Sequence, residues 1–347
     1  FGDKHNGRLY WNQCYKISNG FIRNGHNVYN FSERDKSRSD LLNRFNNNKK
    51  LQSSILETIK IYHPDVVLLG HADRIHLETL EEIRNINPSV KIAEWNVDNY
   101  MLDNTEHKLK TRSRYLDGIF STTADNKLSE CLSGNFVTFF PNIVDPTIEK
   151  LKIFNNSEHN KDIFFALSHG VGTGKLRKKN TKKEINDPRV IFAKEIIAAD
   201  IKVKCNFFGF NNISPVWAEE FNNEISSCYM GLCLQRKPQL KYCLSDRIAQ
   251  YGGNGLMLFI EKDTQFNEFL NDNEEAVFFD DIDDLLEKIN YYKKNKVESL
   301  KIAEAGYNKL HTYCNEKVVT NYFLDCLFSE NLNNLKTEYN WPIHFYK

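Results

Sequence analysis

The sequence predicts an α/β protein made of two doubly wound, Rossmann-like domains that face a cleft. A chain of 347 residues is longer than a single hydrophobic core usually serves, so two domains are expected. Apolar runs alternate with segments of helical character, which favours parallel sheets built from βαβ units. The alternation stops at a polar, Asn-rich linker, 145–162, and then starts again, so each half is expected to form its own sheet.

Strands in the first half are expected in four apolar runs, at 63–71, 90–98, 117–123 and 136–142. These runs are continuous rather than alternating, as is typical of strands that are covered on both faces. Helices are expected near 41–61, 76–87, 105–115 and 125–132. The opening stretch FGDKHNG has no Met and is interpreted as the end of a strand that begins before this sequence.

The second half repeats the alternation. Strands are expected at 162–168, 202–210, 229–235, 256–260 and 276–281, and helices near 187–199, 215–227, 245–251, 264–271, 282–295 and 297–312. The firmest helix is 282–295, because its apolar residues follow the i, i+3, i+4, i+7 spacing of an amphipathic helix. A last helix near 316–328 is expected to pack back toward the first domain. The expected division is therefore 1–148, 149–315 and a C-terminal helix and tail at 316–347.

Composition and charge argue against several classes of protein. The 46 basic and 46 acidic side chains give no formal net charge, which argues against a globally basic nucleic-acid binder. None of the eight cysteines forms a Cys-x-x-Cys pair or a Cys/His cluster with zinc-ligand spacing, so no metal site is expected. Buried free thiols fit a reducing, cytoplasmic location. No stretch approaches the ~20 apolar residues of a membrane span, and no signal peptide is expected.

Loops that follow strands come first in a search for chemistry, because ligands of doubly wound sheets bind where the strands end. The loop SHGVGTGK, 168–175, has alternating glycines that allow backbone N–H groups to approach an anion closely. This pattern predicts a diphosphate cradle. The alternative is a flexible, solvated basic loop, which applies more strongly to the basic run at 175–183. The loop is not a Walker A motif, because Leu176 follows the lysine.

The stretch YCLSDRIAQYGGNG, 242–255, is the second candidate. Ser245 is a natural N-cap and Asp246 suits a first helical turn. Arg247 could pair with a phosphate, and Gln250 could hydrogen-bond to a ribose hydroxyl. Alternatively, Ser245 and Asp246 only cap the helix while Arg247 pairs with an acid. The apolar residues expected on the buried face are Leu244, Ile248 and Tyr251.

Three loops of the first half could supply a general base that deprotonates an attacking hydroxyl. They are FGDKHNGR, GHADR and WNVDNY, and each is expected to follow a strand. The candidate catalytic residues in them are Asp98, Asp73, His5 and Asp3, with His71 as a further candidate. A cap or turn role is the alternative for each of them. Spacing alone does not rank them.

Taken together, these segments resemble the glycosyltransferases of the GT-B fold. In the second half the resemblance rests on SHGVGTGK, PVWAEEF, YMGLCLQRKPQLKYCLSDRIAQYGGNGLMLFI and EEAVFFDDIDDLLEKINYYKKN, and in the first half on GRLYWNQCYKISNGF, HPDVVLLGHAD, IAEWNVD and FFPNIVDP. The chain is most similar to the spore-maturation-protein-like branch of the glycosyl transferases group 1. The resemblance covers nearly the whole chain and is more specific for fold and reaction class than for substrate.

The resemblance implies transfer of a sugar from a nucleotide-sugar donor, most commonly a UDP-sugar, which the second domain binds, to an acceptor on the first. No metal or other cofactor is implied, so positive groups and a helix N-terminus would stabilise the leaving diphosphate. The expected donor-binding residues are Ser168, His169, Gly170, Gly172, Lys175, Arg236, Ser245, Asp246, Arg247, Gln250, Asn254 and Gly255, with Lys237 as an alternative to Arg236. Family members often hold the ribose with a Glu at the position of Gln250.

Three functions remain open at this stage. The first is transfer to a saccharide or lipid-linked glycan, as in polysaccharide biosynthesis. The second is a phage-type enzyme that modifies DNA by glycosylating hydroxymethylated bases, for which the basic run at 175–183 would contact phosphates. The third is a non-catalytic module that binds a nucleotide sugar without turnover. The sequence does not distinguish hexosyl from pentosyl transfer, retention from inversion, or one oligomeric state from another.

Overall fold

The computed structural model describes residues 6–8, 10–38, 48–102, 105–131, 136–168, 187–199, 201–332, 335, 339–341 and 345–346. The chain divides into two compact units. Unit 1 comprises Phe1–Gly7, Asn12–Pro141 and Glu316–Lys347, and unit 2 comprises Arg8–Trp11 and Asn142–Asn315. The segment after Asn315 therefore belongs to the first unit, and the first unit ends somewhat before the expected boundary at 148.

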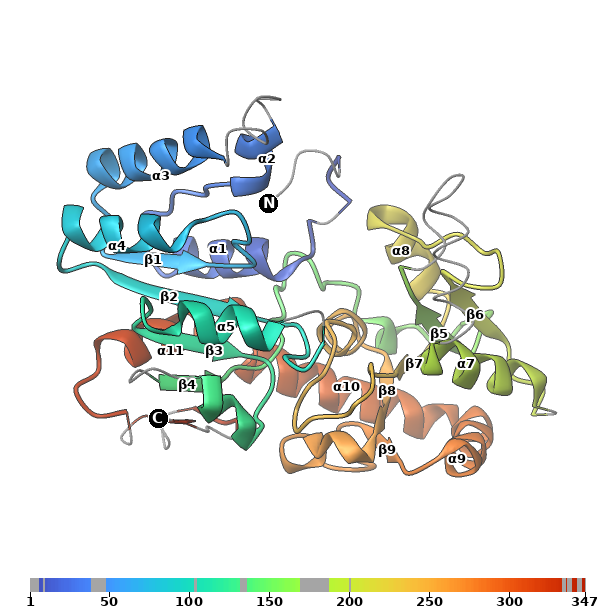
Figure 1. Cartoon of the computed structure of the whole chain (residues 1–347). Helices are drawn as coiled ribbons and strands as arrows, with labels where there is room; N and C mark the ends of the chain where they lie inside the picture. The colour runs from blue at the N-terminus through green and yellow to red at the C-terminus, as the bar shows by residue number, and fades with distance from the viewer. Residues whose placement is uncertain are drawn as a thin grey trace. The chain divides into compact units, whose positions relative to one another are not determined.

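Unit 1 contains a sheet in the order β1-β2-β3-β4-β10 (Figure 1). Its strands are β1 (Val66–Leu69), β2 (Lys91–Asn96), β3 (Gly118–Ser121), β4 (Phe136–Phe139) and β10 (Phe345–Tyr346). The first four strands run parallel, as the continuous apolar runs predict. β10 pairs antiparallel with β4 and was not predicted, because two residues are too few to form a recognisable pattern.

The helices of unit 1 are α1 (Gln13–Arg23), α2 (Glu33–Arg38), α3 (Lys49–Tyr62), α4 (Leu77–Ile86), α5 (Thr105–Ser113), the 3₁₀ helix η3 (Asn126–Cys131) and α11 (Glu316–Phe328). α11 packs against α1. Nη1 of Arg23 lies 2.7 Å from Oε1 of Glu316, and a Cβ on Gly20 would lie 2.2 Å from the carbonyl oxygen of Glu316. A glycine at this point of α1 thus allows the two backbones to approach closely.

Unit 2 contains a fully parallel sheet in the order β6-β5-β7-β8-β9. Its strands are β5 (Ile163–Ala166), β6 (Cys205–Phe208), β7 (Met230–Cys233), β8 (Met257–Glu261) and β9 (Val277–Phe279). Numbered along the chain, the order is 2-1-3-4-5, the flavodoxin-like arrangement. The direction of strand addition therefore reverses between the neighbours β5 and β7.

The helical segments of unit 2 are η4 (Ile153–Asn155), α7 (Pro188–Ala198), α8 (Ala218–Ile225), η5 (Ile248–Gly252), η6 (Lys262–Thr264), η7 (Phe266–Glu268), α9 (Ile282–Lys294) and α10 (Lys296–Tyr313). The firmest predicted helix is confirmed as α9, and its Leu285 and Ile289 are fully buried. Three of the predicted helices are not α-helices. In unit 1, the stretch 125–132 contains the 3₁₀ helix η3. In unit 2, the stretch 245–251 contains a π-helix, η5, and 264–271 contains only 3₁₀ turns.

The absence of an α-helix at 264–271 has a local cause. Oγ1 of Thr264 donates to the carbonyl oxygen of Glu261 at 2.6 Å and accepts from the backbone N–H of Phe266 at 3.3 Å. A side chain that bonds to nearby backbone groups in this way competes with the helical ladder. Gln265, with φ of +58°, also leaves the helical region.

Candidate functional site

The carboxyl ends of β5 and β7 form the first candidate site, within unit 2. The strand order reverses between these neighbours, and ligands of doubly wound sheets bind at such a switch point. Nε of Arg247 donates to the carbonyl oxygen of Ala166 at the end of β5 (3.1 Å). Its Nη1 donates to the carbonyl oxygen of Leu234, directly after β7 (3.3 Å). These contacts fix one guanidinium across the switch point.

Ser245 contributes to the same cluster in a way that differs from its predicted role. The sequence predicts that its hydroxyl caps a helix, but η5 begins only after Arg247, and Oγ of Ser245 accepts from Nη1 of Arg247 at 2.8 Å. The backbone N–H of Ser245 donates to Oε1 of Gln235 at 2.8 Å. The buried Gln235 also donates from Nε2 to the carbonyl oxygen of Cys233 at 3.1 Å. The loop that carries Arg247 is therefore tied to the end of β7.

The positive charge of Arg247 forms no ion pair with a carboxylate among the described residues. The three acceptors of its guanidinium given above are neutral oxygens, and the ring of Phe165 lies 5.3 Å from Cζ. Burial lowers the pKa of Arg247, and the nearby charge of Arg189 acts in the same direction. Because removing a cation from water without a counter-charge is costly, an anionic ligand at this point would be stabilised.

The helix η5 is anchored as the sequence predicts. The three residues expected on the buried face are indeed buried: Leu244 is 2% exposed, Ile248 is 2% exposed and Tyr251 is 1% exposed. The hydroxyl of Tyr251 accepts from the backbone N–H of Ala166 at 3.0 Å, and burial raises the pKa of Tyr251 to about 12. The carbonyl of Asp246 accepts from the N–H of Gln250 at 2.9 Å. These contacts hold η5 against the end of β5.

The glycine turn after η5 uses its polar groups internally. Nδ2 of Asn254 donates to the carbonyl oxygen of Gln250 at 2.7 Å, and its Oδ1 accepts from the N–H of Leu151 at 3.3 Å. Gly255 has φ of +91°, and a Cβ there would lie 2.7 Å from Cδ1 of Phe154. Asn254 and Gly255 thus bind the turn to the segment that precedes β5, and contact of these residues or Gln250 with a donor stays a prediction.

The remaining predicted donor-binding residues lie as follows. Ser168 and Arg236 are exposed, after β5 and β7 respectively. Nζ of Lys237 lies 2.7 Å from Asp263 and 3.0 Å from Glu261, so its charge is balanced within unit 2. The other four, His169, Gly170, Gly172 and Lys175, lie outside the described residues.

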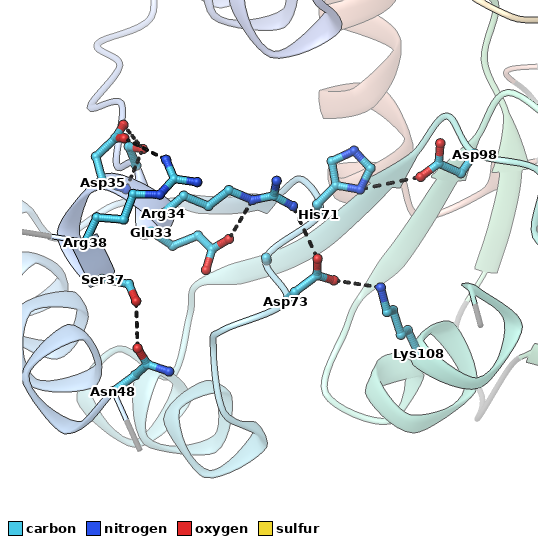
Figure 2. A network of polar contacts seen from close by, with 12 residues as sticks. Glu33, Arg34, Asp35, Ser37, Arg38, Asn48, His71, Asp73, Asp98 and Lys108 are labelled. Carbon is cyan, nitrogen blue, oxygen red and sulfur yellow. Dashed lines mark hydrogen bonds and ion pairs between the residues drawn. The ribbon is translucent and has the colours of Figure 1, made fainter. Parts of the chain in front are cut away.

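The second candidate site lies at the carboxyl ends of β1 and β2 in unit 1. Nδ1 of His71, after β1, lies 3.6 Å from Oδ2 of Asp98, after β2, and the two side chains are 47% and 53% exposed. Figure 2 shows the imidazole and the carboxylate directed toward one another. Asn96 places Asp98, because its Nδ2 donates to the Asp98 carbonyl oxygen at 2.7 Å. An exposed imidazole beside a carboxylate can take a proton from a hydroxyl.

Asp73, a third predicted base, lies between two cations in the same network (Figure 2). Its carboxylate contacts Nζ of Lys108 at 2.9 Å and Nη2 of Arg34 at 3.3 Å. Partial burial acts to raise the pKa of Asp73, but the hydrogen bond and charge of Lys108, with the charges of His71 and Arg34, outweigh it and lower the pKa. A carboxylate held ionised in this way is a weak proton acceptor, so His71 and Asp98 are the better candidates.

The sequence did not point to Gln235 at the first site, nor to three cations of the second site. These are Arg34, Lys108 and Arg112, the last of which donates to the carbonyl oxygens of His71 and Ala72. The available signal was Glu94, an acid in the middle of the apolar run 92–97, because a buried carboxylate requires a partner. The predicted bases Asp3 and His5 lie outside the described residues.

In the described part of the chain, no cluster of three or more side chains could bind a metal ion. None of the described helices is both apolar enough and long enough for a membrane span.

The match to a protein family lies mainly in unit 2. Residues 190–323, from α7 into α11, match the model of a family described as glycosyl transferase-like. This part of the chain contains β7, η5 and Arg247. No curated protein sequence matches the chain.

Solved structures resemble the chain over most of its length. HepE from Anabaena, solved with UDP and glucose, has a TM-score of 0.52 at 9% identity, over 84% of this chain and 83% of that chain. Sucrose-phosphate synthase from Thermosynechococcus elongatus has a TM-score of 0.53 at 10% identity, over 81% and 79%. A glycosyltransferase from Rickettsia africae has a TM-score of 0.50 at 13% identity, over 90% and 88%. The predicted two-domain, Rossmann-like α/β fold class is thereby confirmed.

Proposed function

We propose that this protein is a glycosyltransferase that moves a sugar from a nucleoside diphosphate sugar to a hydroxyl group of an acceptor. The observation that carries the proposal is Arg247, a cation fixed at the β5/β7 switch point with no carboxylate partner among the described residues. It lies in the segment that matches the glycosyl transferase-like family model. Phosphate groups are among the anions that a guanidinium recognises, which supports a diphosphate as the ligand.

A UDP-sugar is the proposed donor. The similar HepE structures were solved with UDP and with UDP-glucose, which supports uridine as the nucleoside to test first. In the proposal Arg247 stabilises the charge that develops on the diphosphate as it leaves, without a step that needs a metal. The exposed residues Ser168 and Arg236, which follow β5 and β7, are proposed to complete the donor site.

Unit 1 is proposed to activate the acceptor. The acceptor oxygen attacks the anomeric carbon of the sugar, its proton passes to the imidazole of His71, and the bond from the anomeric carbon to the diphosphate breaks with its electron pair on UDP. Asp98 would stabilise the imidazolium that forms, because its carboxylate lies 3.6 Å from Nδ1. A saccharide or lipid-linked glycan is the proposed acceptor. The pairing of an imidazole with a carboxylate favours an enzyme over a module that only binds donors.

Release of UDP from a panel of UDP-sugars tests the proposal, first without an acceptor and then with glycans or hydroxymethylated DNA added. His71→Ala should lower the rate of transfer by about 10²–10⁴-fold, as expected for loss of a general base. Asp98→Asn should give a smaller loss with unchanged donor affinity. His107→Ala, at an exposed position of α5, is the matched control and should leave the rate unchanged. Binding of donor without any turnover would instead support the non-catalytic module.

A further inference from the structure

A buried arginine lies beneath the loop that carries His71. Arg112 of α5 donates from Nη1 to the carbonyl oxygen of His71 (3.2 Å) and from Nη2 to that of Ala72 (2.6 Å). Nη1 also lies 3.0 Å from Oε1 of Glu94 in β2, and the side chains of this ion pair are 8% and 7% exposed. Desolvation offsets much of the attraction in a buried ion pair, so stability alone is a weak reason for its presence.

The backbone that Arg112 contacts is in an unfavourable conformation. Ala72 has φ of +39°, in the left-handed region that is unfavourable for a residue with a Cβ. Gln52 holds the far end of the loop, because its Nε2 donates to the carbonyl oxygen of Arg74 at 2.7 Å and its Oε1 accepts from the N–H of His76 at 3.2 Å. Such strain persists only where the surroundings over-determine the conformation.

We infer that Arg112, braced by Glu94, is a positioning residue that holds the 71–72 backbone so that the imidazole of His71 lies beside Asp98. The inference rests on the proposed function, in which His71 is the base. Arg112 is buried and acts through His71 rather than on the substrate. The carboxylate of Glu94 accepts from Arg112 through Oε1, and its buried Oε2 has no hydrogen-bond partner in the described part of the chain.

The decisive experiment is a double-mutant cycle of Arg112→Met and His71→Ala, assayed by UDP release with acceptor. Arg112→Met should lower kcat by about 100-fold, because a displacement of about 1 Å of a catalytic group has this effect, while the Kd of UDP stays unchanged. In the His71→Ala background the same substitution should cause no further loss, since the group it positions is absent. Equal losses in both backgrounds, or an unchanged kcat in Arg112→Met, would overturn the inference.

Arg84→Met is the matched control for lost packing and hydrogen bonds. Arg84 also contacts two carbonyl oxygens and one carboxylate, those of Val90, Tyr115 and Asp117, but at the amino ends of β2 and β3. Because the Arg84 side chain is 34% exposed against 8% for Arg112, its replacement should destabilise unit 1 less, and it should leave kcat unchanged. If Arg112→Met does not fold, Arg112→Lys replaces it in the same cycle, with the same two outcomes deciding.

Hydrogen exchange separates failure of this inference from failure of the proposed function. Should the wild-type protein turn over no nucleotide sugar, the proposed function fails, and the amides of 70–74 are compared in Arg112→Met and Arg84→Met. Faster exchange in Arg112→Met alone supports the positioning of the loop by Arg112. Equal exchange in the two variants contradicts it.

Discussion

Replacing Arg247 with Met should abolish most of the affinity for UDP while leaving the fold intact. Met has a similar length but lacks the charge and the donors of the guanidinium. Three hydrogen bonds from a charged donor are lost, at 3.1, 3.3 and 2.8 Å, and each contributes about 1.5–3 kcal/mol. Removal of a partly buried charge that forms no ion pair among the described residues offsets part of this loss. We therefore expect the free energy of unfolding to fall by about 1–3 kcal/mol, as for most destabilising single substitutions.

The same substitution should also weaken the binding of UDP. A hydrogen bond to a charged group contributes about 1.5–3 kcal/mol, which corresponds to a factor of about 10–150 in Kd. Titration calorimetry with UDP measures this directly. Lys237→Met is the control, because Lys237 already pairs with Glu261 and Asp263 and its removal should change Kd little. A Kd for Arg247→Met equal to that of the wild type would refute the assignment of Arg247 to the donor site.

Three further predictions concern stability. Gly255→Ala should destabilise the protein by about 1–3 kcal/mol, because the φ of Gly255 is +91° and a Cβ there would lie 2.7 Å from Cδ1 of Phe154. Urea unfolding measures this loss, and an unchanged free energy of unfolding would contradict the prediction. Asp73→Asn should cost up to about 1 kcal/mol at pH 7, since Asp73 is partly exposed. Its pKa is depressed in the folded state, so the cost should vanish as pH falls below the ordinary pKa near 4, and a cost that persists at low pH would exclude its ion pair with Lys108 as the cause. Burial raises the pKa of Glu94 to about 7 although Arg112 opposes it, so wild-type stability relative to Glu94→Gln should fall as pH rises from about 4.5 to 7; a pH-independent difference in thermal unfolding would contradict this.

The fold was largely predictable because its information is local. Each parallel strand of the two sheets lies in a continuous apolar run, and α9 follows from the spacing of Ile282, Leu285 and Ile289. The exceptions depend on contacts from distant parts of the chain. β10 exists only through its pairing with β4, and α1 packs on α11, about 300 residues away in the sequence, through a glycine whose purpose no local pattern reveals.

Candidate site residues could be named from the sequence, but their interactions could not. The rule that ligands bind after strands led to Arg247, His71 and Asp98. Sequence spacing could not show that Ser245 accepts from Arg247 instead of capping a helix, because that choice depends on where η5 begins. It also could not show that Asp73 is bound by two cations from separate helices. Such contacts join elements that only the folded sheet brings together.

The most direct test of the account is a structure of the protein with a UDP-sugar bound. We expect the diphosphate at the carboxyl ends of β5 and β7, within hydrogen-bonding distance of the guanidinium of Arg247. A UDP-sugar bound elsewhere, with Arg247 keeping only its contacts to Ala166, Leu234 and Ser245, would contradict the account.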